Sequence, residues 1–220
     1  MFIGHWSAAF AARAMSERSP RLGTLFVAAQ LVDWAFFTFV LLGIEHMRVV
    51  PGITAMNPMD LYDMPWTHSL LGTCGFAFTF GAIVWLGMRE LFPALITAMV
   101  VVSHWLLDFI VHRPDLTLAG FPPKLGMGLW NIPSVEAPLE LALTFGTMWW
   151  YIRRTDGPPV PPLILAIMLI ALQLFNWLAP SPATGAPVAP MAMMALAAYL
   201  LTTIVAWWVG TTRRHRCKID

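Results

Sequence analysis

Six long apolar runs constrain the fold of this chain more than any other feature. They cover about residues 22–44, 67–87, 91–112, 133–152, 162–179 and 191–210. Each approaches or exceeds the roughly 20 residues that an α-helix needs to cross a bilayer. The chain is 58% hydrophobic and 11% charged, whereas soluble domains carry roughly 25% charged residues. The sequence therefore predicts an all-α, polytopic membrane helix bundle with six transmembrane helices.

A seventh apolar run, Phe2–Met15, is too short to span a bilayer. Its small residues favour close packing between helices. We expect either a short N-terminal helix packed into the bundle or a re-entrant segment. The sequence shows no internal repeat and no separate soluble domain, so residues 1–220 are expected to form a single integral membrane domain.

The basic residues predict how the bundle is oriented. If the loops alternate sides, ten basic residues share a side with the 13–21 loop, and only Arg48, Arg113 and Lys124 fall on the other side. The positive-inside rule makes the first side cytoplasmic. We therefore expect a multi-pass protein of the cell inner (plasma) membrane with membrane lipid around it and a cytoplasmic C-terminus that includes Lys218. A net charge of +1 excludes a typical nucleic-acid-binding protein.

The most informative polar residues are His104, Asp108 and His112. They recur every four residues in an apolar run and therefore share one helix face. Ionisable groups at this depth are costly and need partners. His104-x-x-x-Asp108 can place two ligands on one Zn, Mn or Fe ion. The alternative is a buried hydrogen-bonded pair, and for His112 a solvated or gating role is an equal alternative.

Further candidates lie in the same half of the chain. Asp33 is a lone carboxylate in mid-helix, which must be paired, metal-bound or protonated. His68 is expected to open a helix, and His5 lies early in the short N-terminal segment. Glu45 and His46 are expected in a solvated loop. Ionisable residues are sparse beyond 162, so residues 1–140 are predicted to bear the site and residues 141–220 to form scaffold helices and a basic tail.

The ordered set of these residues resembles the LexA-regulated (LexA-binding) inner-membrane metal-dependent hydrolase family. The matching positions are His5, Asp33, Thr67-His68-Ser69 and His104-x-x-x-Asp108, which cover about 110 residues. Two positions depart from the family pattern. Its Asp-x-Asp is reduced to Asp33, and the first His of its His-Arg-Gly-x-Thr-His-Ser motif is Asp63, which can still bind a metal through oxygen.

The resemblance implies a membrane-embedded metal-dependent hydrolase of an ester or phosphoester. His5, Asp33, His68, His104 and Asp108 would hold one or two divalent ions, with Zn expected. Asp63 or Glu140 would take the proton of the attacking water, and Glu136 or Glu140 would orient a ligand histidine. A site in the outer leaflet would meet lipid-linked substrates. Two alternatives remain open: a proton-coupled transporter, and a non-catalytic or pigment-associated subunit of a larger membrane complex.

Overall fold

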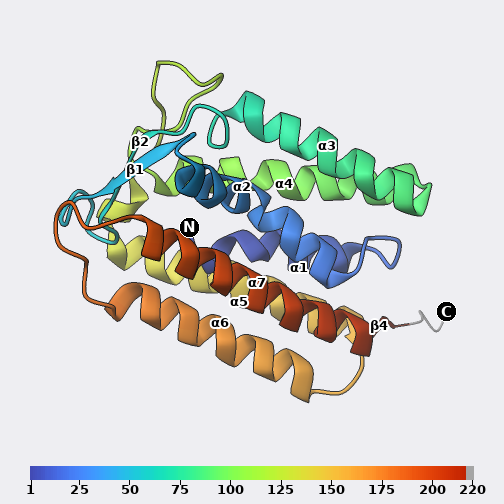
Figure 1. Ribbon diagram of the computed structural model, residues 1–220. Helices are drawn as coiled ribbons and strands as arrows, with labels where there is room; N and C mark the ends of the chain where they lie inside the picture. Colours follow the sequence, from blue (N-terminus) through green and yellow to red (C-terminus); the bar gives the residue numbers. More distant parts are fainter. Residues whose placement is uncertain (217–220) are drawn as a thin grey trace.

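A computed structural model describes residues 1–216 as a mostly helical bundle (Figure 1). Cys217 and Lys218 lie outside the described residues. Across the described part of the chain there are seven α-helices: α1 (Trp6–Met15), α2 (Leu22–Leu42), α3 (Leu70–Met88), α4 (Leu91–Val111), α5 (Pro133–Arg154), α6 (Val160–Leu178) and α7 (Ala189–Thr212).

Five of these helices are long and apolar enough to cross a membrane: α2, α3, α4, α6 and α7. The sixth predicted span, 133–152, forms a helix of 22 residues, but α5 is not among the five. Its first two turns carry Glu136 and Glu140, and both side chains are buried within the bundle. The predicted helical membrane bundle is thus confirmed in outline, whereas the count of six spans is not.

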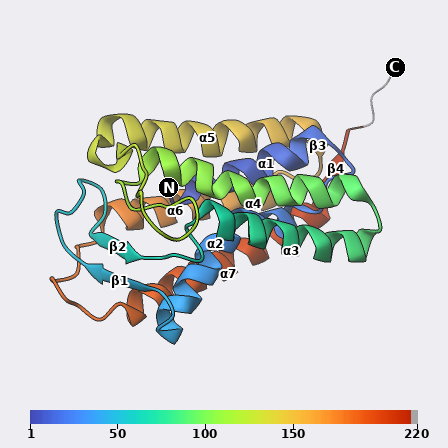
Figure 2. The same ribbon diagram turned by 90° about the horizontal axis from the view of Figure 1, so that it is seen from above.

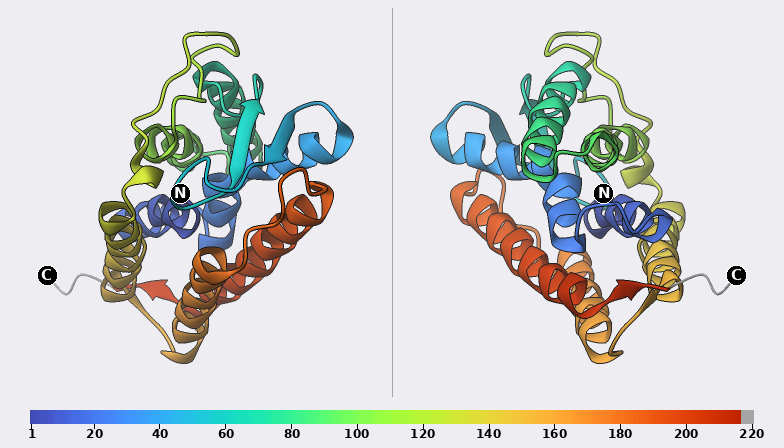
Figure 3. Two further views of the ribbon diagram at one scale, coloured as in Figure 1. Left: turned by 90° about the vertical axis from the view of Figure 1, so that its left-hand side faces the viewer. Right: turned by 90° about the vertical axis from the view of Figure 1, so that its right-hand side faces the viewer.

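The N-terminal run forms a short helix packed into the bundle, not a re-entrant segment. A single 3-10 turn, η1 (Ile3–His5), leads directly into α1. Trp6 and Phe10 are fully buried, and α1 packs against α2 and α5. The chain therefore begins in the middle of the bundle, between the longer helices (Figures 1 and 3).

The connections between helices alternate between the two ends of the bundle (Figures 1 and 2). One end, here called the hairpin end, holds the segments 43–69, 112–132 and 179–188. The α1–α2, α3–α4 and α5–α6 connections and the end of α7 lie at the opposite end. Nine of the ten basic residues expected on one side are described, and all belong to that opposite end: Arg13, Arg18, Arg21, Arg89, Arg153, Arg154, Arg213, Arg214 and Arg216.

The hairpin end contains strands that the hydrophobic pattern does not predict. β1 (His46–Val49) and β2 (Met59–Asp63) pair antiparallel, with Arg48 opposite Asp60. Asp60 is buried and accepts hydrogen bonds from Arg48 Nε at 2.6 Å and from Arg113 of the second loop. These bonds tie the two loops together over the bundle. A second short pair, β3 (Thr155–Asp156) and β4 (Arg214–His215), joins α5 to the end of α7.

Candidate metal centre

The five residues predicted to bind a metal are brought together toward the hairpin end. α4 presents His104 and Asp108 on one face, and α2 contributes Asp33. His68 lies two residues before α3 rather than within it, and His5 ends η1. Their donor atoms form two groups that share His104, namely His5, His104 and Asp108, and Asp33, His68 and His104. In each group the atoms lie within 4.8 Å of one another, so buried His and Asp residues here could hold a metal ion.

The separations between donor atoms suit ligands of one ion. His104 Nε2 lies 3.1 Å from Asp108 Oδ2 and 3.5 Å from Asp33 Oδ1. His68 Nε2 lies 3.6 Å and 3.5 Å from the same two oxygens. Two ligands bound at about 2.0 Å to a tetrahedral ion lie about 3.3 Å apart. The four observed distances bracket that value.

The two oxygens of Asp108 face different partners. Oδ2 faces His68 and His104. Oδ1 lies 3.1 Å from His5 Nε2, 3.4 Å from His112 Nε2 and 3.1 Å from the Met1 amino nitrogen. Asp108 is therefore the central carboxylate of the cluster, with imidazoles on both sides.

The far ring nitrogens of His104 and His68 are fixed by hydrogen bonds. His104 Nδ1 donates to the carbonyl oxygen of Ala29 at 2.8 Å, and a carbonyl can only accept. Thr67 Oγ1 donates to Glu45 Oε2 at 2.6 Å, so it accepts from His68 Nδ1 at 2.9 Å. In the neutral form, both rings then turn an unprotonated Nε2 toward the carboxylates. Outer partners of this kind are typical of metal-binding histidines.

Glu45 is part of this support and was not expected there. Its side chain is fully buried rather than solvated, and Oε1 accepts the backbone N–H groups of Trp66 and Thr67. Trp105 Nε1 donates to the carbonyl of His68 at 3.2 Å. Three anchors thus hold the short segment before α3, which explains how a loop residue can be positioned as rigidly as a helical one.

We predict that Thr67→Val weakens zinc binding by about 10- to 100-fold without unfolding the protein, the effect typical of losing an outer partner of a metal ligand. Valine keeps the shape but removes the hydroxyl that accepts from His68. Competition with a chelating dye measures the affinity. Thr79→Val is the matched control, because Thr79 is exposed on α3 and, among residues 1–216, its hydroxyl bonds only to the carbonyl of Gly75. Equal affinities for the two variants would contradict the role of Thr67 as an outer partner of His68.

His112 belongs to the cluster and is not solvated. It is buried, and its Nδ1 lies 2.8 Å from Asp115 Oδ1 while its Nε2 faces Asp108. Burial lowers the pKa of His112, but the carboxylates of Asp108 and Asp115 outweigh it and raise the pKa to about 9. The surroundings of His112 therefore stabilise a positive charge on its ring.

His5 differs from the other histidines of the cluster. Its ring stacks on His104, with centroids 3.7 Å apart and an angle of 6° between the planes. Burial and the neighbouring His104 lower the pKa of His5 to about 4, although Asp108 acts in the opposite direction. The lowered pKa favours the neutral imidazole of His5, the form that binds metals.

Several buried polar atoms of the cluster lack hydrogen bonds within residues 1–216. They include both ring nitrogens of His5, His104 Nε2 and Asp108 Oδ2. His5 Nε2, His104 Nε2 and Asp108 Oδ2 each lie 3.1 Å from an atom of the cluster but are not aligned with it for a hydrogen bond. An unpaired buried polar atom costs about 1–3 kcal/mol. Imidazole nitrogens and carboxylate oxygens are common ligands of zinc, so these residues fit a divalent ion by donor type and by spacing.

The last two helices, which are expected to be scaffold, each donate one hydrogen bond to a carboxylate beside the cavity. Tyr199 of α7 donates to Asp33 Oδ2 at 3.0 Å. Gln173 of α6 donates to Glu140 Oε2 at 2.7 Å. Neither residue is ionisable at neutral pH, and neither belongs to a motif, so a search for acids and imidazoles passes over both.

The two residues predicted to take a proton have other partners. Asp63 is half-exposed in β2, where its Oδ2 lies 2.7 Å from His46 Nδ1, and the structure does not bring it into the cluster. Glu140 accepts from Gln173 and from the backbone N–H groups of Phe2 and Gly4, so it anchors the N-terminal segment. Glu136, one turn away, keeps its Oε2 buried without a hydrogen bond within residues 1–216.

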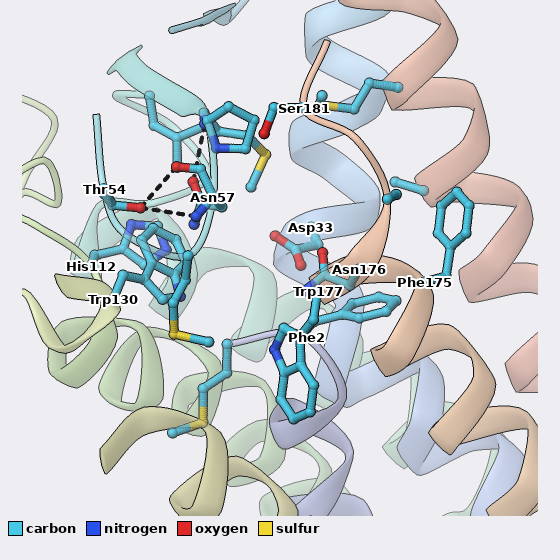
Figure 4. Close-up of a pocket in the computed structure, with 18 of the residues that line it drawn as sticks. Phe2, Asp33, Thr54, Asn57, His112, Trp130, Phe175, Asn176, Trp177 and Ser181 are labelled. Atoms are coloured by element: carbon cyan, nitrogen blue, oxygen red, sulfur yellow. Dashed lines mark hydrogen bonds between the residues drawn. The ribbon is translucent and has the colours of Figure 1, made fainter. Parts of the chain in front are cut away.

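A cavity of about 850 Å³ adjoins the cluster (Figure 4). Asp33 points into it between two walls. His112, Trp130 and the segment around Thr54 form one wall, and Phe2 and the end of α6 form the other. Its lining also includes His68, Asp108, Glu136 and Glu140. Asp33, His68 and Asp108 of the candidate donor set therefore border a space large enough for a small molecule.

Comparison of the chain with models of protein families, with curated proteins and with solved structures finds no match.

Proposed function

We propose that this protein is a membrane-embedded, metal-dependent hydrolase that cleaves an ester or phosphoester from the extracytoplasmic side. One observation carries the proposal. The Nε2 atoms of four buried histidines converge on two carboxylates, at 3.1–3.6 Å. Three of those rings have their Nδ1 atoms bound elsewhere. Such a donor set fits a cation better than it fits a network of hydrogen bonds.

Within this proposal, some residues of the site would bind metal and another would take up a proton. Asp33, His68, His104 and Asp108 would hold one ion, and His5 and the second oxygen of Asp108 offer donors for another. That oxygen also accepts from the Met1 amino group at 3.1 Å. When bound, a divalent ion of this kind supplies Lewis acidity, which polarises an ester or phosphoester and makes water more acidic. Glu136 lines the same cavity with a free carboxylate oxygen, so we assign the uptake of the proton to Glu136 rather than to Glu140.

The resemblance to the LexA-regulated inner-membrane hydrolase family supports the same assignment through His5, Asp33, His68, His104 and Asp108. The distribution of basic residues supports the orientation. Arginines gather at the end of the bundle away from the cluster, which would face the cytoplasm of a cell with this protein in its inner membrane, and the C-terminus would lie there too.

Metal content of the purified protein tests the proposal. We expect one or two zinc, manganese or iron ions per chain, together with hydrolysis of p-nitrophenyl esters or bis(p-nitrophenyl) phosphate in detergent. His104→Ala should lose both metal and hydrolysis. His46→Ala is the matched control, because His46 is exposed in β1. A folded wild-type protein that holds no metal, and that stays inactive after zinc is added, would overturn the proposal.

A further inference from the structure

The cavity beside the cluster has an apolar wall with a regular pattern. Four residues of α7 that line it, Met191, Met194, Ala195 and Ala198, follow the spacing i, i+3, i+4, i+7. On α6, Leu172, Phe175 and Asn176 line it, and Ala179, directly after the helix, continues the same spacing. Each set forms one helix face about 10 Å long. Since α6 packs against α7, the two faces make one largely apolar strip that leads to Asp33, with Asn176 as the polar residue among those named.

The strip continues onto the outer surface of the bundle. Phe175 and Met194 line the cavity, yet each leaves about half of its side chain exposed, at 52% and 50%. Both belong to helices apolar enough to cross a membrane. Residues that are part of a cavity wall and of a lipid-facing surface mark a lateral opening between the two. A chain of methylene groups can lie along this route without leaving an apolar environment.

The other end of the cavity selects against highly charged headgroups. Its lining contains the carboxylates of Asp33, Asp108, Glu136 and Glu140, and no Lys or Arg side chain of residues 1–216. Arginine and lysine are the usual partners of phosphate groups. Without them, bound metal, the Met1 amino group and His112 are left to offset a phosphoryl charge against four carboxylates, so a diphosphate is disfavoured relative to a carboxylic ester or a single phosphoester.

We infer that the substrate is a membrane lipid whose ester or single phosphoester lies at the cluster and whose hydrocarbon chain lies along the α6–α7 strip. The part of this inference that names the cleaved bond rests on the proposed function. The binding of the lipid chain rests only on the cavity itself, which has the volume and the mixed lining typical of ligand sites.

Photo-cross-linking in vesicles tests the inference. The probe is a phosphatidylcholine that carries a diazirine in the acyl chain near the carbonyl. Mass spectrometry should find cross-links at Phe175 or Met194 in the wild-type protein. Ala198→Phe fills the strip and should lower this labelling about tenfold, because a tightly packed wall cannot absorb the added ring. Ala197→Phe is the matched control, because Ala197 is exposed and does not line the cavity.

The outcomes separate this inference from the proposed function. Labelling that follows the expected pattern in a protein without metal or hydrolysis would support the lipid site and overturn the hydrolase. The opposite result is hydrolysis of a water-soluble ester by the wild-type protein, together with equal cross-linking at α6–α7 in Ala198→Phe and Ala197→Phe. It would support the hydrolase and overturn the lipid site. Asp108→Asn should keep the labelling, since the chain is bound away from the donor atoms.

Discussion

Replacing Asp108 with asparagine is expected to remove the bound metal and the hydrolytic activity together. The two oxygens of Asp108 serve two pairs of imidazoles, with His5 and His112 on one side and His68 and His104 on the other. Asparagine has the same shape but only one acceptor atom and no charge. One pair of histidines would then face an NH2 group. Loss of an outer partner costs about 10- to 100-fold, so loss of this central ligand should cost about a thousandfold or more.

Metal content and turnover are measured on the same preparation, with Asp63→Asn as the control. That substitution removes the same charge from a half-exposed carboxylate outside the cluster. We expect it to keep the wild-type metal content and activity. An Asp108→Asn protein that retains its metal would mean that the cluster is only a buried hydrogen-bonded network.

Much of this architecture can be predicted from the sequence, because bilayer spans and i, i+4 spacing are local patterns. The apolar runs predicted the helical bundle, and the spacing of His104 and Asp108 placed both on one face of α4. The count of six spans is not confirmed: the run 133–152 forms the helix α5, but α5 carries Glu136 and Glu140 in its first two turns and is not among the five helices apolar enough to cross a membrane.

The partners that complete the site are long-range contacts and leave no local signal. Thr67 donates a hydrogen bond to Glu45, which lies 22 residues away in the sequence, and Tyr199 donates one to Asp33, which lies 166 residues away. Strands β1 and β2 are also only 4 and 5 residues long, too short for alternation of apolar residues to stand out. The sequence favoured Glu140 over Glu136 as the proton acceptor, and the hydrogen bonds that occupy Glu140, from Gln173 and the N-terminal backbone, could not be seen from it.

Removing the metal from the wild-type protein should lower its midpoint of thermal unfolding in detergent by about 10 °C. A ligand present at about 1,000 times its dissociation constant stabilises the folded state by about 4 kcal/mol, and for chains of this size each kcal/mol shifts the midpoint by about 2–4 °C. The physical cause is the convergence of buried donor atoms: without a cation, the unpaired atoms of His5, His104 and Asp108 face one another in an apolar interior.

Thermal scans with and without a chelator measure the shift, and added zinc should reverse it. Asp108→Asn provides the internal control, since a protein that holds no metal has none to lose and should melt at the same temperature with and without chelator. Asp63→Asn should shift as the wild type does. If the chelator leaves the wild-type midpoint unchanged, the imidazoles and carboxylates must stabilise one another as imidazolium–carboxylate pairs. In that case Asp108→Asn should itself destabilise the fold by about 3–5 kcal/mol, because it would leave buried positive charge without a partner.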